Sequence, residues 1–155
     1  MTMTRFIFYL CFFLTAVVFA QEDENAKVKA TIDTFFEGFH KGDTIIMKSV
    51  MMDKMLLQTT YTTQEGTNIL VSEESSKLMS AIANRTNDQK WDERLLNYNI
   101  QVDGIMANVW TPYEFWFNDT FSHCGVNSFQ LFNDHGTWKI IYLIDTRRKQ
   151  GCNQP

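Results

Sequence analysis

Three strand-like runs fill the C-terminal third of the sequence, and they constrain the fold more than any other stretch. They cover residues 107–117, 121–132 and 137–146 and are rich in Val, Ile, Tyr, Phe and Trp, which favour half-buried strands. Two short polar turns separate them. The first is Asn118-Asp119, and the second, NDHG at 133–136, is typical of a type I turn closed by a left-handed glycine. The pattern predicts a long antiparallel meander, covered on one face by the upstream segments.

Residues 1–20 differ in character from the rest of the chain. Arg5 is their only charge, the run from 6 to 20 is almost unbroken apolar sequence, and small residues precede Gln21. This pattern is typical of a secretory signal peptide with cleavage before Gln21. The alternative, an uncleaved membrane anchor, needs about 20 apolar residues, and this run is shorter. We therefore expect an exported protein, periplasmic or extracellular, with no stable membrane insertion after cleavage.

The remainder has the length of one ordinary domain. We expect a short mobile lead over residues 21–25, a domain over 26–148 and a C-terminal tail over 149–155. The whole chain has a net charge of −4, which argues against nucleic acid as a partner. Cys124 and Cys152 remain after cleavage, and an even pair favours a disulfide in an oxidising compartment. If the tail does not fold back, they are two unrelated thiols.

A helical pattern opens the domain. Apolar residues recur at steps of three and four, which predicts an amphipathic helix ending near Lys41. Gly42 is expected to provide a left-handed cap, and Asp43 to cap a second, shorter helix that extends to Met51. The residues expected to face the core from the first helix are Val28, Ile32, Phe35, Phe36 and Phe39.

The middle of the chain alternates between strand and helix signals. Residues 54–63 read as a first strand, and Ser72 is expected to cap a third helix over residues 73–83. Residues 91–102 are strand-like, and Asp103-Gly104 is a two-residue hairpin signal leading into the meander. The predicted order is therefore two helices, a strand, a third helix and four antiparallel strands.

This order resembles the cone-shaped α+β fold of nuclear transport factor 2 (NTF2), in which a curved antiparallel sheet wraps around three N-terminal helices. The resemblance covers residues 26–148 and depends on FFEGFHKGD at 35–43 and GTWKI at 136–140. The stretch from SHCG at 122–125 through DTRR at 145–148 is similar to exported bacterial members described as SnoaL-like or lumazine-binding-like. The resemblance implies a pocket at the open end of the cone. The superfamily includes isomerases, dehydratases, binding proteins and dimerisation modules, so the fold leaves the function open.

His123 and Asp145 are the first candidates for chemistry in such a pocket. If the last turn is a three-residue loop, His123 faces Arg147 across the final hairpin, with Asp145 as a diagonal neighbour. A histidine held by a carboxylate is a candidate general base. A two-residue loop would instead place His123 and Asp145 on opposite faces. The competing interpretation is a structural histidine beside an Asp145–Arg147 salt bridge. His40 and His135 are not expected to approach His123, so no metal site is predicted.

Pro112 suggests a second set of candidates. Proline cannot donate to a strand ladder, so its presence inside a predicted strand indicates an edge or a bulge. Trp110 and Tyr113 could then turn into the pocket and stack on a flat ligand. Alternatively, these aromatic residues pack in the core or at a dimer interface.

Asp33 provides a third candidate, with Tyr61 and Tyr98 as possible hydrogen-bonding companions. The resemblance implies that a carboxylate deep in the cone could have a raised pKa. Helical periodicity instead places Asp33 on the solvent-exposed face of the first helix.

Both faces of the terminal hairpin are apolar, so each face is expected to pack against another part of the protein or another chain. One face is expected to pack on the helices and the other to form a homodimer through the open side of the sheet. Alternation assigns Phe129, Leu131, Ile141 and Leu143 to one face, and Val126, Phe132, Ile140, Tyr142 and Ile144 to the other.

Three functions are consistent with these features. The leading hypothesis is an exported domain that binds a small apolar or aromatic molecule without a cofactor, using Trp110, Tyr113 and Arg147. The alternative is an isomerase or dehydratase in which His123 is the base, Asp145 orients it and Tyr113 donates a hydrogen bond. The third is a dimerising module with a vestigial pocket. A deep pocket with His123 and Asp145 in hydrogen-bond contact favours catalysis, an aromatic lining favours binding, and a filled pocket favours the module.

Overall fold

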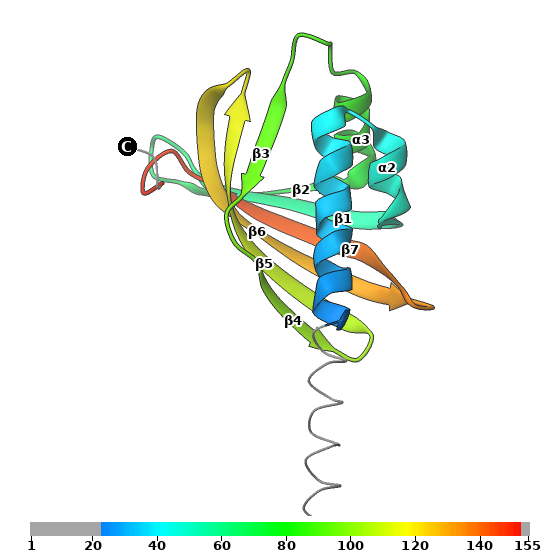
Figure 1. Ribbon diagram of the computed structural model, residues 1–155. Coiled ribbons are helices and arrows are strands. Elements are labelled where there is room, and N and C mark those ends of the chain that lie inside the picture. The colour runs from blue at the N-terminus through cyan, green and yellow to red at the C-terminus, as the bar shows by residue number, and fades with distance from the viewer. Residues whose placement is uncertain (1–22, 153–155) are drawn as a thin grey trace, which may run out of the picture.

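The structure is a computed structural model that describes residues 23–152 (Figure 1). The predicted signal peptide and its cleavage site before Gln21 lie outside the described residues. Within residues 23–152, no helix is both long enough and apolar enough to cross a membrane.

The described part of the first helix covers residues 23–41 and therefore includes residues 23–25, which were expected to form a mobile lead. Gly42 follows with a φ of 74°. The carboxylate of Asp43 accepts hydrogen bonds from the backbone N–H groups of Ile45 and Ile46 and caps α2 (Thr44–Ser49). As predicted, the apolar side chains of the first helix face the core; Val28, Ile32, Phe35, Phe36 and Phe39 are all buried.

In the described part of the chain, seven strands form one curved sheet in the order β2-β1-β7-β6-β5-β3, with β4 also paired to β5. The sheet is mixed rather than purely antiparallel, because β1 and β7 pair in parallel. The strands are β1 (Met51–Thr62), β2 (Asn68–Glu74), β3 (Trp91–Leu95), β4 (Asn99–Asp103), β5 (Met106–Phe117), β6 (Thr120–Asp134) and β7 (Thr137–Arg147).

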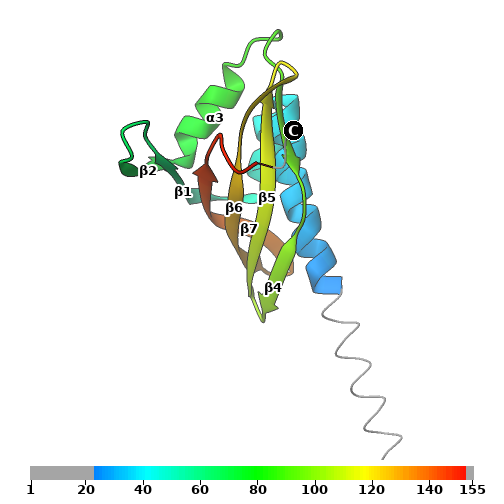
Figure 2. The ribbon, with the colours of Figure 1, turned by 90° about the vertical axis from the view of Figure 1, so that its left-hand side faces the viewer.

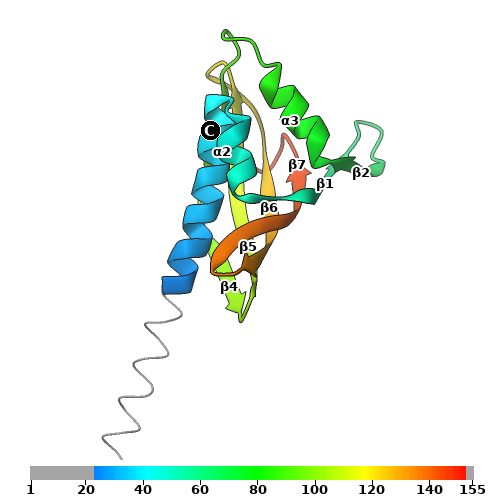
Figure 3. The ribbon, with the colours of Figure 1, turned by 90° about the vertical axis from the view of Figure 1, so that its right-hand side faces the viewer.

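The helices of residues 23–152 lie on the concave face of this sheet. The first helix runs along the sheet with α2 beside its C-terminal half, and α3 (Ser75–Ala83) lies on the other side of α2 (Figure 1, Figure 3). Figure 2 shows the strands from the left-hand side of Figure 1, with the helices beyond and beside them. The rings of Phe35 and Phe36 pack edge-on against Phe129 of β6, which fixes the helix to the sheet. The predicted fold class, an α+β cone, is confirmed.

The last hairpin combines the shorter of the two loops considered from the sequence with a bulge. Together they move the pairing of β6 with β7 by two residues relative to a three-residue loop, so Cys124 pairs with Arg148 and His123 does not face Arg147. The loop has two residues, His135 and Gly136, both with positive φ, so Asp134 pairs with Thr137. Further along, β7 contains one extra residue, Ile141, between the pairs Leu131–Ile140 and Gln130–Tyr142.

The shorter loop alone would have placed His123 and Asp145 on opposite faces, but the bulge restores the parity. Asn127 now faces Asp145, and both His123 and Asp145 point to the concave face. The assignment of Ile140 and Ile141 to the two faces was therefore wrong. Ile140 is fully buried, whereas Ile141 is 36% exposed.

The break between β3 and β4 explains the proline inside β5. The predicted single strand over 91–102 is two strands, and both pair with β5. Pro112 lies opposite the gap between them, and its carbonyl accepts a hydrogen bond from the Leu96 N–H at 2.9 Å. Because Pro112 lies opposite this gap, its missing N–H does not remove a hydrogen bond between strands.

The start of α3 was also wrongly predicted. Ser72 lies in β2, which continues to Glu74, and α3 begins at Ser75 without a side-chain cap.

Candidate functional site

A cavity of about 390 Å³ lies between α3, the end of the first helix and the concave face of the sheet. Aromatic and aliphatic side chains form most of its wall, and charged groups lie at its inner end and at its mouth. A recess of about 60 Å³ adjoins it and reaches Asn127 and Asp145. The residues lining the main cavity are Phe39, Leu57, Thr59, Glu73, Lys77, Leu78, Ala81, Trp91, Glu93, Phe115, Phe117, His123 and Arg147.

A row of polar side chains crosses four strands at the floor of this space. Strand pairing places Thr111 of β5 beside Asn127 of β6, Asn127 beside Asp145 of β7, and Asp145 beside Thr59 of β1. Thr111, Asn127 and Asp145 are all buried. Burying a polar group is costly unless the group is hydrogen-bonded. The side chains of this row must therefore find hydrogen-bond partners within the protein or on a ligand.

The carboxylate of Asp145 accepts hydrogen bonds from three side chains of the protein. The donors are Thr59 Oγ1 at 2.5 Å, Tyr113 OH at 3.1 Å and Arg147 Nε at 2.8 Å. Burial, together with the charges of Asp145 and Glu93, raises the pKa of Tyr113, so this hydroxyl stays protonated and donates. Asp145 therefore acts as the buried counter-ion of Arg147.

His123 lies on the same face but has different partners. Its Nδ1 is 3.0 Å from Ser122 Oγ, and its ring packs against Phe115 at 5.1 Å between centroids. Burial and the nearby Arg147 charge lower the pKa of His123 to about 4. The imidazole is therefore neutral at pH 7, and the hydrogen bonds of Asp145 go to Thr59, Tyr113 and Arg147 rather than to His123.

Glu93 is the central group of the cavity, and it was not among the residues predicted from the sequence. It lines both the cavity and the recess, and Asn127 Nδ2 donates a hydrogen bond to its Oε1 at 2.7 Å. Burial raises the pKa of Glu93 to about 7, against the lowering effect of the bond from Asn127. Alternation along Trp91, Glu93 and Leu95 was a signal that could have placed this carboxyl on the inner face.

Two of the remaining candidates lie away from the cavity. Trp110 is on the outer face of β5 and is 50% exposed. Asp33 is exposed, as helical periodicity predicted, and joins the first helix to the segment after β3 by accepting a hydrogen bond from Tyr98 OH at 2.5 Å. Its other oxygen pairs with Lys29 at 2.7 Å. Tyr61 also lies away from the cavity and lines a shallow groove beside Arg148.

Trp91 carries an unused donor at the cavity wall. Its indole Nε1 is buried and has no hydrogen-bond partner among residues 23–152. The guanidinium of Arg85 lies 5.6 Å from the centre of the ring.

Solved structures with the same architecture are similar to the whole described domain. An NTF2-like superfamily protein from Salmonella enterica is 15% identical, with 87% of this chain and 99% of that chain aligned and a TM-score of 0.62. A proposed dehydratase of the NTF2-like family from Streptomyces avermitilis is 12% identical, with 83% and 98% aligned and a TM-score of 0.63. The association domain of CaMKII from C. elegans is 16% identical, with 81% and 97% aligned and a TM-score of 0.60.

The chain has the NTF2-like fold. No protein-family model matches its sequence, and no curated protein matches it significantly. At these identities the NTF2-like structures show the fold alone, since proteins of one fold carry out different functions.

A disulfide closes the C-terminal end of the NTF2-like domain. Cys124 of β6 is bonded to Cys152, with 5.8 Å between their Cα atoms. The backbone N–H and C=O of Cys124 also pair with Arg148, at 2.9 Å each. The tail therefore lies beside β6, next to His123.

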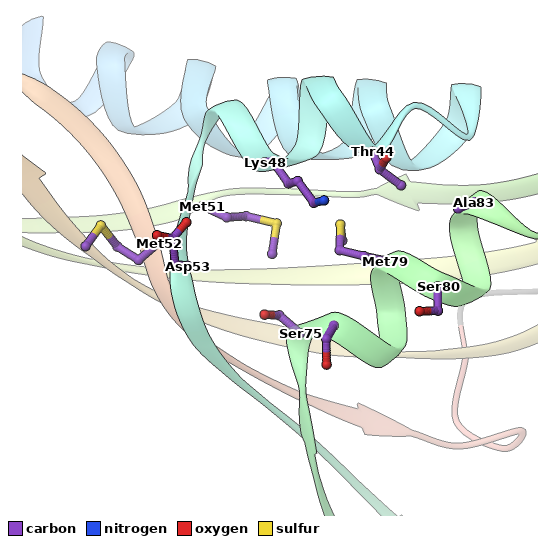
Figure 4. A pocket seen from close by; sticks show the side chains of 10 residues that line it. Thr44, Lys48, Met51, Met52, Asp53, Ser75, Met79, Ser80 and Ala83 are labelled. Atoms are coloured by element: carbon purple, nitrogen blue, oxygen red, sulfur yellow. The ribbon is translucent and has the colours of Figure 1, made fainter.

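A second hollow, of about 540 Å³, lies between α2, β1 and α3 (Figure 4). Met51 and Met79 extend into it from β1 and α3, and Lys48 reaches across from α2. Serine and threonine hydroxyls line most of the rest, and none of the aromatic residues between 23 and 152 does. Within residues 23–152, no cluster of three or more His, Cys, Asp or Glu side chains could hold a metal ion. We therefore take the aromatic cavity as the candidate site of this NTF2-like domain.

Proposed function

We propose that this protein binds a small apolar or aromatic molecule in the cavity between α3 and the sheet. The observation that supports this most directly is the lining, in which Phe39, Trp91 and Phe115 surround a space large enough for a small flat molecule. Polar groups at one end, chiefly Glu93 and Arg147, would orient the ligand. The expected binding role of Trp110 is withdrawn, because its side chain lies on the opposite face of β5.

The open cavity argues against the dimerising-module hypothesis. A vestigial pocket would be filled by its own side chains, whereas this one retains about 390 Å³. The similarity to a CaMKII association domain concerns the fold and does not change this preference.

Two exposed alanines of α3 provide a matched test. Ala81 lines the aromatic cavity and Ala83 lines the second hollow, so Ala81→Phe and Ala83→Phe add the same group to different spaces. Binding of 2-acetylnaphthalene, followed by tryptophan fluorescence, should weaken at least about tenfold in Ala81→Phe, because the new ring occupies the space of the ligand. Ala83→Phe should bind like the wild type. Equal affinities for both variants would contradict the proposal.

Native mass spectrometry of the protein, expressed with its first 20 residues, would test both export and the presence of a copurified ligand. We propose that the mature protein begins at Gln21 and is exported, which is consistent with the disulfide between Cys124 and Cys152. The expected mass is that of residues 21–155, less two hydrogens, together with any ligand that copurifies. A full-length mass in the cytoplasmic fraction would contradict export.

A second candidate function is proton transfer in an isomerase or dehydratase, with Glu93 as the acid and base. The observation that favours it is the place of Glu93, which lines both the cavity and the recess. Burial there raises the pKa of Glu93 to about 7, and a proton-transfer group works best near the ambient pH. His123 is less suited to the role of base, because its pKa is lowered to about 4. Under this candidate, Glu93→Gln should abolish turnover of a substrate and retain its binding, whereas His123→Asn should retain both.

A further inference from the structure

The polar groups of the aromatic cavity present more hydrogen-bond donors than acceptors. The Asp145 carboxylate is occupied by three donors, and one oxygen of Glu93 is occupied by Asn127. Arg147 uses Nε on Asp145 and one Nη2 hydrogen on Thr59, at 3.4 Å. Within residues 23–152 the remaining guanidinium N–H groups have no hydrogen-bond partner, although Arg147 lines both the cavity and the recess.

Glu93 and Arg147 are the two polar groups that line both spaces, so a ligand group placed between them would meet both. A protonated Glu93 offers an O–H donor there, and the buried N–H of Trp91 is another unused donor in the same wall. A ligand must therefore supply acceptors. A carboxylate has two oxygens and about four acceptor positions, and it fits the planar guanidinium of Arg147.

We infer, on the basis of the proposed binding function, that the ligand is a small apolar or aromatic monocarboxylate. Its carboxylate lies between the guanidinium of Arg147 and the protonated carboxyl of Glu93, and its apolar body lies against Phe39, Trp91 and Phe115. The ligand carboxylate adds one negative charge beside the Asp145–Arg147 pair, whose own charges already neutralise each other. An ionised Glu93 would repel the ligand carboxylate, so binding requires Glu93 to hold its proton.

The charges around Glu93 come from several elements. Asp145 and Arg147 belong to β7, neutral His123 to β6, Glu73 to β2 and Lys77 to α3. Glu73 and Lys77 pair with each other at the exposed mouth, at 3.3 Å. The His40 ring, on the first helix, accepts the backbone N–H of Glu93 at 3.0 Å, and burial lowers the pKa of His40, so it is neutral at pH 7. Glu93, whose pKa is raised to about 7 by burial, is therefore expected to change charge near pH 7.

The test compares 2-naphthoate with its neutral isostere 2-naphthamide from about pH 6 to about pH 9. In the wild type, affinity for the acid should fall by up to about tenfold per pH unit above about 7, because each complex takes up one proton. Affinity for the amide should be nearly constant. Calorimetry at about pH 9, in buffers with different ionisation enthalpies, should show uptake of close to one proton per bound naphthoate, because most free Glu93 is ionised there; this measurement needs no variant.

Glu93→Gln supplies the matched variant. The glutamine amide has the shape of the glutamic acid side chain, accepts from Asn127 and donates to the ligand, but it does not titrate. The variant should bind naphthoate with a pH-independent affinity, whereas Glu73→Gln at the mouth should retain the slope of the wild type. If naphthamide binds as tightly as naphthoate, without proton uptake by either, the inference is overturned and the proposed binding function stands. If neither compound binds and 2-acetylnaphthalene also fails, the inference and the proposed function fail together.

Discussion

Gly125 shows how one residue keeps the polar row intact. It lies on β6 opposite Tyr113, whose hydroxyl must reach Asp145 on β7. A Cβ on Gly125 would lie 1.7 Å from the Thr146 carbonyl oxygen and 2.8 Å from Cε1 of Tyr113. The absence of a side chain therefore lets the tyrosine ring lie across β6 and deliver its hydroxyl to the buried carboxylate.

Gly125→Ala should accordingly destabilise the protein by about 3 kcal/mol or more, since the contact is with backbone that cannot move without breaking the β6–β7 ladder. Urea unfolding followed by circular dichroism would measure the loss. Gly66→Ala is the control. Gly66 has a φ of 82° but nothing within 4 Å, so only backbone strain of about 1 kcal/mol is expected there. Similar losses for the two variants would show that the close approach at Gly125 is not important.

At the scale of elements, the tail and α3 define the surroundings of the cavity. The tail is held beside β6 by the pairing of Cys124 with Arg148 and by the disulfide to Cys152. This contact adjoins His123, which lines the cavity, so the order of the tail affects the wall of the site. In contrast, α3 carries Lys77, Leu78 and Ala81 over the opposite side.

Cys152→Ser should lower the free energy of unfolding by about 3 kcal/mol, as expected from loop-closure entropy for cysteines separated by 28 residues. Denaturation of the oxidised wild type, the reduced wild type and the variant would measure this. Reduction should bring the wild type to the midpoint of the variant. An oxidised wild type no more stable than its reduced form would contradict a stabilising disulfide.

At the scale of the molecule, helices cover one face of the sheet, and the other face remains partly apolar. Met106 and Trp110 on β5 are 56% and 50% exposed. Phe132, Tyr142 and Ile144 extend this outer surface over β6 and β7 as partly buried residues. We propose, as the sequence pattern suggested, that a second copy of the chain covers this surface.

Trp110→Glu should then convert a dimer into a monomer, because it places a charge in the middle of the apolar contact. Size-exclusion chromatography with light scattering would measure the mass. Leu96→Glu is the matched control, since Leu96 is similarly exposed but lies in the segment between β3 and β4. A monomeric wild type, or equal behaviour of the two variants, would contradict the dimer.

The sequence by itself determined the local elements and, through their order, the fold class. The step pattern from Val28 to Phe39, the cap at Asp43 and the runs of β-branched and aromatic residues predicted helices and strands correctly, because these signals act between near neighbours. Only the tertiary structure decided the site. The relation of His123 to Asp145 depended on a short loop and a bulge at Ile141, which together restore the parity of the two side chains, and the bulge was not evident locally. Glu93 gained its raised pKa from burial by helix and strand partners distant in sequence, and such burial exists only once the sheet has curved around the first helix.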